Sequence, residues 1–139
     1  MLVIGDADAL IALSDISDVN HQKAKDILSF LSHNPLDIYF PATALAEAIT
    51  TAQRKMDNRA LAKVLVSKVV SNDLAIFPVN SEALSLAASL FDSDSSKQNT
   101  FFDAIVAAIA KKNAAVAIFS FDSWYKKKGF TLARDLQAD

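Results

Sequence analysis

Residues 2–13 read LVIGDADALIAL, and this stretch decides the fold. The apolar run at 2–5 predicts a short strand, and the Ala- and Leu-rich segment from about Ala7 to Leu13 predicts a helix. Asp6 stands at the junction between the two. A strand that leads directly into a helix is the opening unit of an α/β protein.

Short β-type runs continue to alternate with longer helical runs. Strands are predicted near residues 38–40, 75–77, 115–121 and 131–133. Helices are predicted near residues 18–32, capped by Asp18, and near 41–55, 59–70, 81–91 and 100–112, with a polar loop at 92–98 and a short turn at 124–127. Hairpin signals such as Asn-Gly are missing between the strands. We therefore predict an α/β three-layer sandwich, with a mainly parallel central sheet of about five strands flanked by helices.

Composition limits the classes of protein to consider. A chain of 139 residues with 52% hydrophobic content predicts one compact domain over residues 1–139. The absence of Cys excludes disulfides and thiolate zinc sites and fits a cytoplasmic location, and the uncharged runs are too short to cross a membrane. A net charge of −2 argues against coating nucleic acid by charge alone, but it suits an enzyme that contacts a few phosphates.

Four carboxylates lie beside or inside apolar runs: Asp6, Glu47, Asp103 and Asp122. Open parallel sheets bind ligands outside the carboxyl ends of their strands, and Asp6 and Asp122 both follow predicted strands there. At an effective dielectric near 20, two such charges about 5 Å apart repel by roughly 3 kcal/mol. A gathered set therefore needs protons or a hard divalent cation, and oxygen ligands favour Mg²⁺ or Mn²⁺. Hydrolysis of a phosphate ester is the chemistry that such a site indicates.

Each carboxylate taken alone also has a purely structural explanation. Asp6 can cap a helix, and Asp103 can form a capping box with Thr100. Glu47 can lie on an exposed helix face, and Asp122 can form an Asx turn. The hypothesis of a cation site therefore depends on the four residues as a set.

The order of the acidic motifs is more specific. The chain contains VIGDAD at 3–8, LAE at 45–47, DAIVAA at 103–108 and SFD at 120–122. Over essentially its whole length it resembles PIN-domain proteins of the VapC toxin type. These open with a strand running into Asp-Thr/Ser, carry Leu-Ala-Glu in a helix, start a later helix with Asp-Ala-x-Ile-Ala, and end with Thr/Ser-x-Asp. The departures are Ala7, where the family usually has a hydroxyl residue, and Asp8, which replaces a small polar one.

The resemblance implies that Asp6, Glu47, Asp103 and Asp122 form a catalytic quartet on a parallel sheet. It implies Mg²⁺ or Mn²⁺ held by Asp6 and Asp103 with help from Asp122, and water as the nucleophile. Glu47 would complete the cation's ligands or help to deprotonate the water.

Asp8 and Ser120 are candidates to hydrogen-bond the carboxylates that hold the cation. The loss of a hydroxyl at Ala7 removes one such bond, so cation affinity or phosphate placement is expected to differ from the family's.

The resemblance further implies an endoribonuclease acting on single-stranded or looped RNA, as the toxin of a type II toxin–antitoxin pair. A small antitoxin would occupy the acidic groove, and the protein would form a homodimer. Four lysines are candidate RNA-binding residues, although lysine runs are also typical of solvated faces: Lys111, Lys126, Lys127 and Lys128. Trp124 and Tyr125 are predicted to pack in the protein rather than to stack on bases.

Two other functions are compatible with the sequence. Asp6 and Asp8 match the Asp-x-Asp of a haloacid-dehalogenase-type phosphatase, in which the first Asp attacks phosphate and the second acts as acid and base. The expected Gly/Thr-rich continuation does not follow Asp8. A catalytically degenerate PIN fold acting as a binding module is the other alternative, and the altered first motif is its support.

Overall fold

The computed structural model describes residues 1–91 and 99–138 of the chain. Within these residues, four strands form one sheet in the order β3-β2-β1-β4, and every adjacent pair is parallel. The strands are β1 (Leu2–Gly5), β2 (Asp37–Pro41), β3 (Ile76–Phe77) and β4 (Ala117–Phe119). The prediction of an α/β fold with a parallel sheet is confirmed, with four strands in place of about five.

The predicted strand at 131–133 is reduced to a single bridge. Leu132 pairs in parallel with Ile118, and a 3₁₀ helix, η2 (Ala133–Ala138), follows at once. The carbonyl of Leu132 accepts a hydrogen bond from the Asp135 N–H at 2.9 Å, so the chain coils directly after the bridge. Leu132 and Ala133 are both fully buried, and they anchor this turn to the core.

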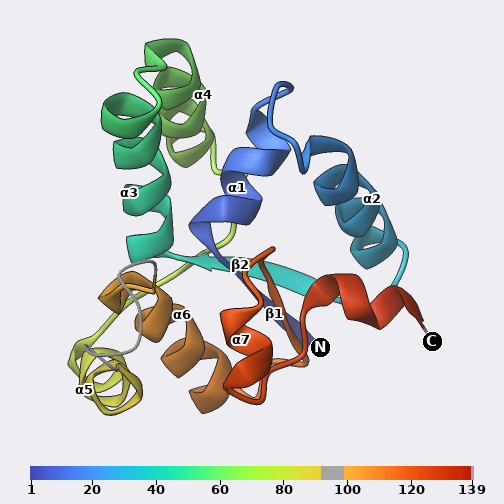
Figure 1. Cartoon of the computed structure of the whole chain (residues 1–139), viewed down its shortest axis with the longest axis vertical. Helices are drawn as coiled ribbons and strands as arrows, with labels where there is room; N and C mark the ends of the chain where they lie inside the picture. Colours follow the sequence, from blue (N-terminus) through green and yellow to red (C-terminus); the bar gives the residue numbers. More distant parts are fainter. Residues whose placement is uncertain (92–98, 139) are drawn as a thin grey trace.

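Helices cover both faces of the sheet. Figure 1 shows α1 to α4 on one side and α5, α6 and α7 on the other. Their bounds are α1 (Ala7–Ser14), α2 (His21–Ser32), α3 (Ala42–Thr50), α4 (Arg59–Val70), α5 (Ser81–Leu90), α6 (Phe101–Lys112) and α7 (Trp124–Lys127). In the described part of the chain, no helix has the length and apolar character needed to cross a bilayer.

Alternate residues of the central strands point into different core clusters, as the pleat of a strand requires. Val3 and Phe119 pack in the cluster that contains α2, whereas Ile4 and Ile118 pack in the cluster that contains α6. A third cluster joins α1 and β2 to α3 and α4, which form a helical hairpin. The three-layer arrangement is therefore confirmed. It also determines the position of the helix that follows the carboxyl end of each strand.

Two helix boundaries differ from the prediction. α2 begins at His21, because Asp18 accepts the N–H of Asn20 at 2.8 Å and forms a turn ahead of the helix. The predicted helix at 41–55 ends as α3 at Thr50 and continues as a π-helical turn, η1 (Thr51–Lys55). There the carbonyls of Thr51 and Ala52 accept hydrogen bonds from Met56 and Asn58, in the turn that leads to α4. The predicted polar loop at 92–98 lies outside the described residues.

Candidate active site

Asp6 lies where the carboxyl end of β1 meets α1. Its Oδ1 accepts the N–H of Ala7 at 2.7 Å, and its own N–H donates to the Phe119 carbonyl at the end of β4 at 3.0 Å. Only 4% of Asp6 is exposed. The predicted helix cap is therefore present, and it holds a buried carboxylate at the edge of the sheet where ligands bind.

Two further carboxylates meet Asp6 at this edge. Glu47 comes from α3 and Asp103 from the first turn of α6, and one oxygen from each of the three lies within 4.8 Å of the others. Asp103 is 7% exposed, and its Oδ2 accepts the N–H of Thr100 at 2.9 Å, as the predicted capping box requires. The fold thus gathers acids that are 41 and 56 residues apart in the sequence.

Asp122 lines the same pocket but is not a member of this group of three. Its Oδ2 accepts a hydrogen bond from the Asn99 side-chain amide, and its Oδ1 accepts the N–H of Trp124, both at 2.9 Å. The second bond is the Asx turn that the sequence allowed. Asp122 therefore lies at the rim of the pocket with both oxygens engaged.

The pocket that these residues share has a volume of about 540 Å³. Besides the four acids and Asp8, its wall includes the hydroxyl residues Thr51 and Thr100 and one cation, Lys55. Lys55 ends the π-helical turn that follows α3. The site thus combines a cluster of carboxylates with one basic side chain near its entrance.

Burial and mutual repulsion both disfavour the ionised acids. Burial raises the pKa of Asp6 well above its ordinary value, and the charges of Asp8 and Asp103 raise it further. Burial also raises the pKa of Asp103, although the Thr100 N–H opposes this shift. Burial raises the pKa of Glu47 to about 7, with contributions from Asp103 and Asp8, while Lys55 lowers it. Such a group of oxygens is one that a divalent cation relieves, because its charge favours the ionised form of every carboxylate.

Asp8 and Ser120 connect the start of α1 to the loop after β4. The Oδ2 of Asp8 accepts hydrogen bonds from Ser120 Oγ at 3.0 Å and from the Phe121 N–H at 2.8 Å. Ser120 Oγ in turn accepts the N–H of Asp122 at 3.0 Å. Asp8 therefore holds in place the backbone that carries Asp122.

Tyr125 is the site residue for which the sequence predicted packing alone. The side chain is fully buried, as predicted, but its hydroxyl donates to Asp6 Oδ2 at 2.5 Å and lies 3.5 Å from Asp103 Oδ1. A buried tyrosine needs a partner for its hydroxyl. The sequence did offer one signal that Tyr125 lies near the site, because Tyr125 follows Asp122 by three residues, about one helical turn.

The predicted RNA-binding lysines lie elsewhere. Lys126 forms an ion pair with Asp135 at 3.2 Å, and Lys128 lies 5.7 Å from the centre of the Trp124 ring. Lys111 is at the far end of α6, roughly 12 Å along the helix from Asp103. Among the described residues, Lys55 is the only lysine or arginine that lines the acidic pocket.

Comparison with known proteins identifies a family and solved structures with a similar fold. The model of the PIN domain family matches residues 3–130. The fold is similar to the crystal structure of Mycobacterium tuberculosis VapC20, a toxin that cleaves the sarcin-ricin loop. The TM-score is 0.78, with 19% sequence identity over 93% of this chain and 96% of that chain. A comparison with curated proteins finds no match.

Proposed function

Because this chain belongs to the PIN domain family, we propose that it is a Mg²⁺- or Mn²⁺-dependent endoribonuclease that hydrolyses RNA phosphodiesters, with residues 1–139 as its single domain. The observation that carries the proposal is the convergence of Asp6, Glu47 and Asp103, with oxygens within 4.8 Å of one another in one pocket. Structural needs alone explain each residue singly, but they do not explain three acids at one point for which the described residues provide no ion pair.

The donor set fits a hard divalent cation, since every candidate ligand is a carboxylate oxygen. Asp6 and Asp103 would hold the cation, and Glu47 and Asp122 would complete its surroundings from α3 and from the rim. When bound, such a cation lowers the pKa of water and offsets charge on a phosphoryl group.

The protein's own groups have distinct tasks in this proposal. Glu47, with an oxygen within 4.8 Å of those of Asp6 and Asp103, is placed to accept a proton from the attacking water. Tyr125 holds the Asp6 carboxylate in one orientation through its hydroxyl. Ser120 fixes the backbone of Asp122, so the rim carboxylate keeps its place.

The proposal includes a toxin's role in the cytoplasm, with a small antitoxin as partner and a homodimer as the assembly. The similarity in fold to VapC20 supports it. The electrostatics of the pocket support it as well, because clustered carboxylates attract a guanidinium group for the same reason that they attract Mg²⁺. An arginine of the antitoxin would therefore compete with the cation.

The test is a digest of total RNA and of synthetic single-stranded and hairpin RNA by the purified protein, with Mn²⁺, with Mg²⁺ and with EDTA. We expect cleavage that requires the cation and that disappears in Asp6→Asn and in Asp103→Asn. Asp15→Asn, at a carboxylate outside the acidic pocket, is the matched control and should cleave normally.

Other outcomes would assign another function. A folded wild type that cleaves no RNA, and whose RNA binding is unchanged by Asp6→Asn, would be a degenerate binding module. A covalent acyl-phosphate trapped on Asp6 would indicate the phosphatase. That alternative is not favoured, because Asp8, its required acid and base, accepts hydrogen bonds from Ser120 and from two backbone N–H groups.

A further inference from the structure

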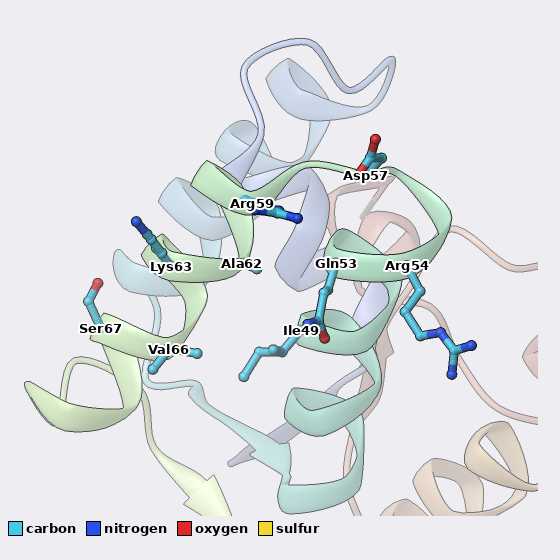
Figure 2. A pocket seen from close by; sticks show the side chains of 9 residues that line it. All are labelled: Ile49, Gln53, Arg54, Asp57, Arg59, Ala62, Lys63, Val66 and Ser67. Carbon is cyan, nitrogen blue, oxygen red and sulfur yellow. The ribbon is translucent and has the colours of Figure 1, made fainter.

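A second hollow, larger than the acidic pocket, lies on the helical hairpin of α3 and α4. This hairpin groove runs between α3 with its π-helical turn and α4, and its volume is about 1140 Å³. Figure 2 shows Ile49 and Val66 pointing toward each other between the two arms, with Arg59 reaching into the space above them. Lys63 lies at the outer rim. The groove therefore has an apolar floor, with Arg59 above it and Lys63 at its rim.

Positive charge is concentrated on this hairpin. Residues 48–70 contain five lysines and arginines and a single acid, Asp57, although the whole chain has a net charge of −2. In Figure 2 the Asp57 carboxylate points up, away from the floor of the groove. Within the described residues, no ion pair involves Arg59 or Lys63. These cations are therefore available to a polyanion.

The π-helical turn joins the hairpin groove to the acidic pocket. Thr51 and Lys55 of this turn line the acidic pocket, whereas Gln53 and Arg54 line the groove. In a regular α-helix of 3.6 residues per turn, Lys55 would be rotated by roughly 80° from Glu47, eight residues earlier. The wider π turn reverses part of that rotation, so Lys55 reaches the pocket that holds Glu47. Local π-helical turns occur frequently at functional sites.

We propose that the hairpin groove binds the sugar–phosphate backbone of the RNA substrate beside the bond to be cleaved, with Arg59 and Lys63 on its phosphates and Lys55 at the junction with the acidic pocket. This inference rests on the proposed function, because it describes where the RNA that the nuclease cleaves would bind. A strand leaving the acidic pocket past Lys55 would cross the π-helical turn to reach the groove. The apolar floor of Ile49 and Val66 gives unstacked bases a surface to contact.

Binding is tested separately from cleavage, with a fluorescent single-stranded RNA and the Asp103→Asn background. Arg59→Gln/Lys63→Gln removes two cations and should weaken binding by about tenfold or more at low salt, and it should reduce the slope of log K against log salt by about 1.4. Lys23→Gln/Lys25→Gln, on α2, is the matched control of equal charge. It should leave affinity and slope close to those of the parent. α2 lies across α1 from the hairpin (Figure 1).

A second measurement uses cleavage by the enzyme with its acidic residues intact. Arg59→Gln/Lys63→Gln should raise KM for a long RNA and leave the cleavage of a dinucleotide unchanged, because a dinucleotide does not reach the groove. Lys55→Gln should impair both substrates.

Three results would overturn the proposal. The first is an unchanged affinity and salt slope in Arg59→Gln/Lys63→Gln, and the second is an equal loss in the α2 control. The third is an acidic helical peptide that binds the wild type and not the groove variant while RNA binding is unchanged, which would assign the groove to a protein partner. RNA binding that depends on Arg59 and Lys63 without any cleavage would instead contradict the proposed function and leave the groove assignment standing.

Discussion

The hydroxyl of Tyr125 donates a 2.5 Å hydrogen bond to Asp6 Oδ2, joining α7 to the carboxylate at the end of β1. This bond lowers the pKa of Asp6 against burial and the charges of Asp8 and Asp103, which raise it. The Asp6 carboxylate in turn raises the pKa of Tyr125, after burial, so the phenol keeps its proton and remains a donor. Ala7 has no hydroxyl to offer Asp6, but Tyr125, near the other end of the chain, supplies one.

Removal of this hydroxyl should weaken cation binding. Tyr125→Phe keeps the buried ring but leaves Asp6 without its side-chain donor, and we expect Mn²⁺ affinity or activity to fall by about 10- to 100-fold, as is typical when a ligand loses its supporting hydrogen bond. Calorimetric titration with Mn²⁺ measures the effect. Tyr39→Phe, at an exposed tyrosine that packs edge-on against Phe77, is the control and should bind as the wild type does. Equal affinities in all three proteins would contradict the assignment of Tyr125.

The hydroxyl of Ser120 is expected to matter for stability and for turnover. Ser120→Ala leaves the Asp122 N–H and one acceptor site of Asp8 without a partner in a buried setting, and this should destabilise the protein by about 1–3 kcal/mol. Cleavage should also slow, because Asp122 loses its fixed position. Chemical denaturation measures the stability. Ser71→Ala removes an exposed hydroxyl that donates to Asp73, and it should change stability by less than about 0.5 kcal/mol.

The sequence predicted most elements of the fold, because the strands lie in short apolar runs and the longer helices carry periodic apolar residues. The edge that strand ends and helix starts share in a parallel sheet predicted that Asp6, Asp103 and Asp122 lie together, and the family resemblance added Glu47, which lies inside α3. The sequence could not separate Asp122 from the others, since the difference comes from hydrogen bonds to Asn99 and to the Trp124 N–H. These bonds depend on how two loops meet, and no local pattern encodes that.

The π-helical turn and the tyrosine hydroxyl were missed for a related reason. The sequence from Ala42 to Lys55 contains no Gly or interior Pro to end the helix, and the wide turn forms just before the chain reverses into α4. The pattern around Tyr125 predicts a buried ring, but it does not say which polar group meets the hydroxyl. In both cases the tertiary contact decides the detail.

The acidic pocket should make the metal-free protein more stable as pH falls. The pKa of Glu47 rises from 4.5 to about 7 on folding, so the folded state binds more protons than the unfolded state between these pH values. The stability that Glu47 contributes is fully present below about pH 4.5 and is lost as pH rises through 7. The raised pKa values of Asp6 and Asp103 change the stability in the same direction.

Glu47→Gln isolates this contribution. In EDTA, its melting temperature should depend less on pH between 5 and 8 than that of the wild type, because one of the shifted groups is gone. Glu82→Gln, at an exposed glutamate that pairs with Lys112 and whose pKa is lowered by it, should retain the wild-type dependence over this range. Parallel melting curves of Glu47→Gln and wild type over this range would show that Glu47 does not titrate as proposed.

Replacing Asp103 with Asn should weaken cation binding without lowering stability, because it relieves the repulsion between the clustered carboxylates. Asn can still accept the Thr100 N–H, so Asp103→Asn should leave melting in EDTA unchanged or slightly raised. The wild type should gain about 2.7 kcal/mol at a Mn²⁺ concentration 100 times its Kd, whereas the variant should gain little. Thermal melting with and without Mn²⁺ measures both effects. A variant that loses stability in EDTA but still responds fully to Mn²⁺ would indicate a structural role for Asp103 alone.

Gly5 is expected to be essential for the position of Asp6. A Cβ at Gly5 would overlap the buried ring of Phe40 on β2, and the backbone there is not in the left-handed region, so the penalty is one of space. Gly5→Ala should destabilise the protein by about 1–3 kcal/mol or more and lower Mn²⁺ affinity, since β1 must shift and carries Asp6 with it. The double variant Gly5→Ala/Phe40→Leu removes the overlapping ring atoms. It should therefore recover Mn²⁺ affinity even though Phe40→Leu alone lowers stability, and a double variant that binds Mn²⁺ no better than Gly5→Ala would place the cause elsewhere than in this overlap.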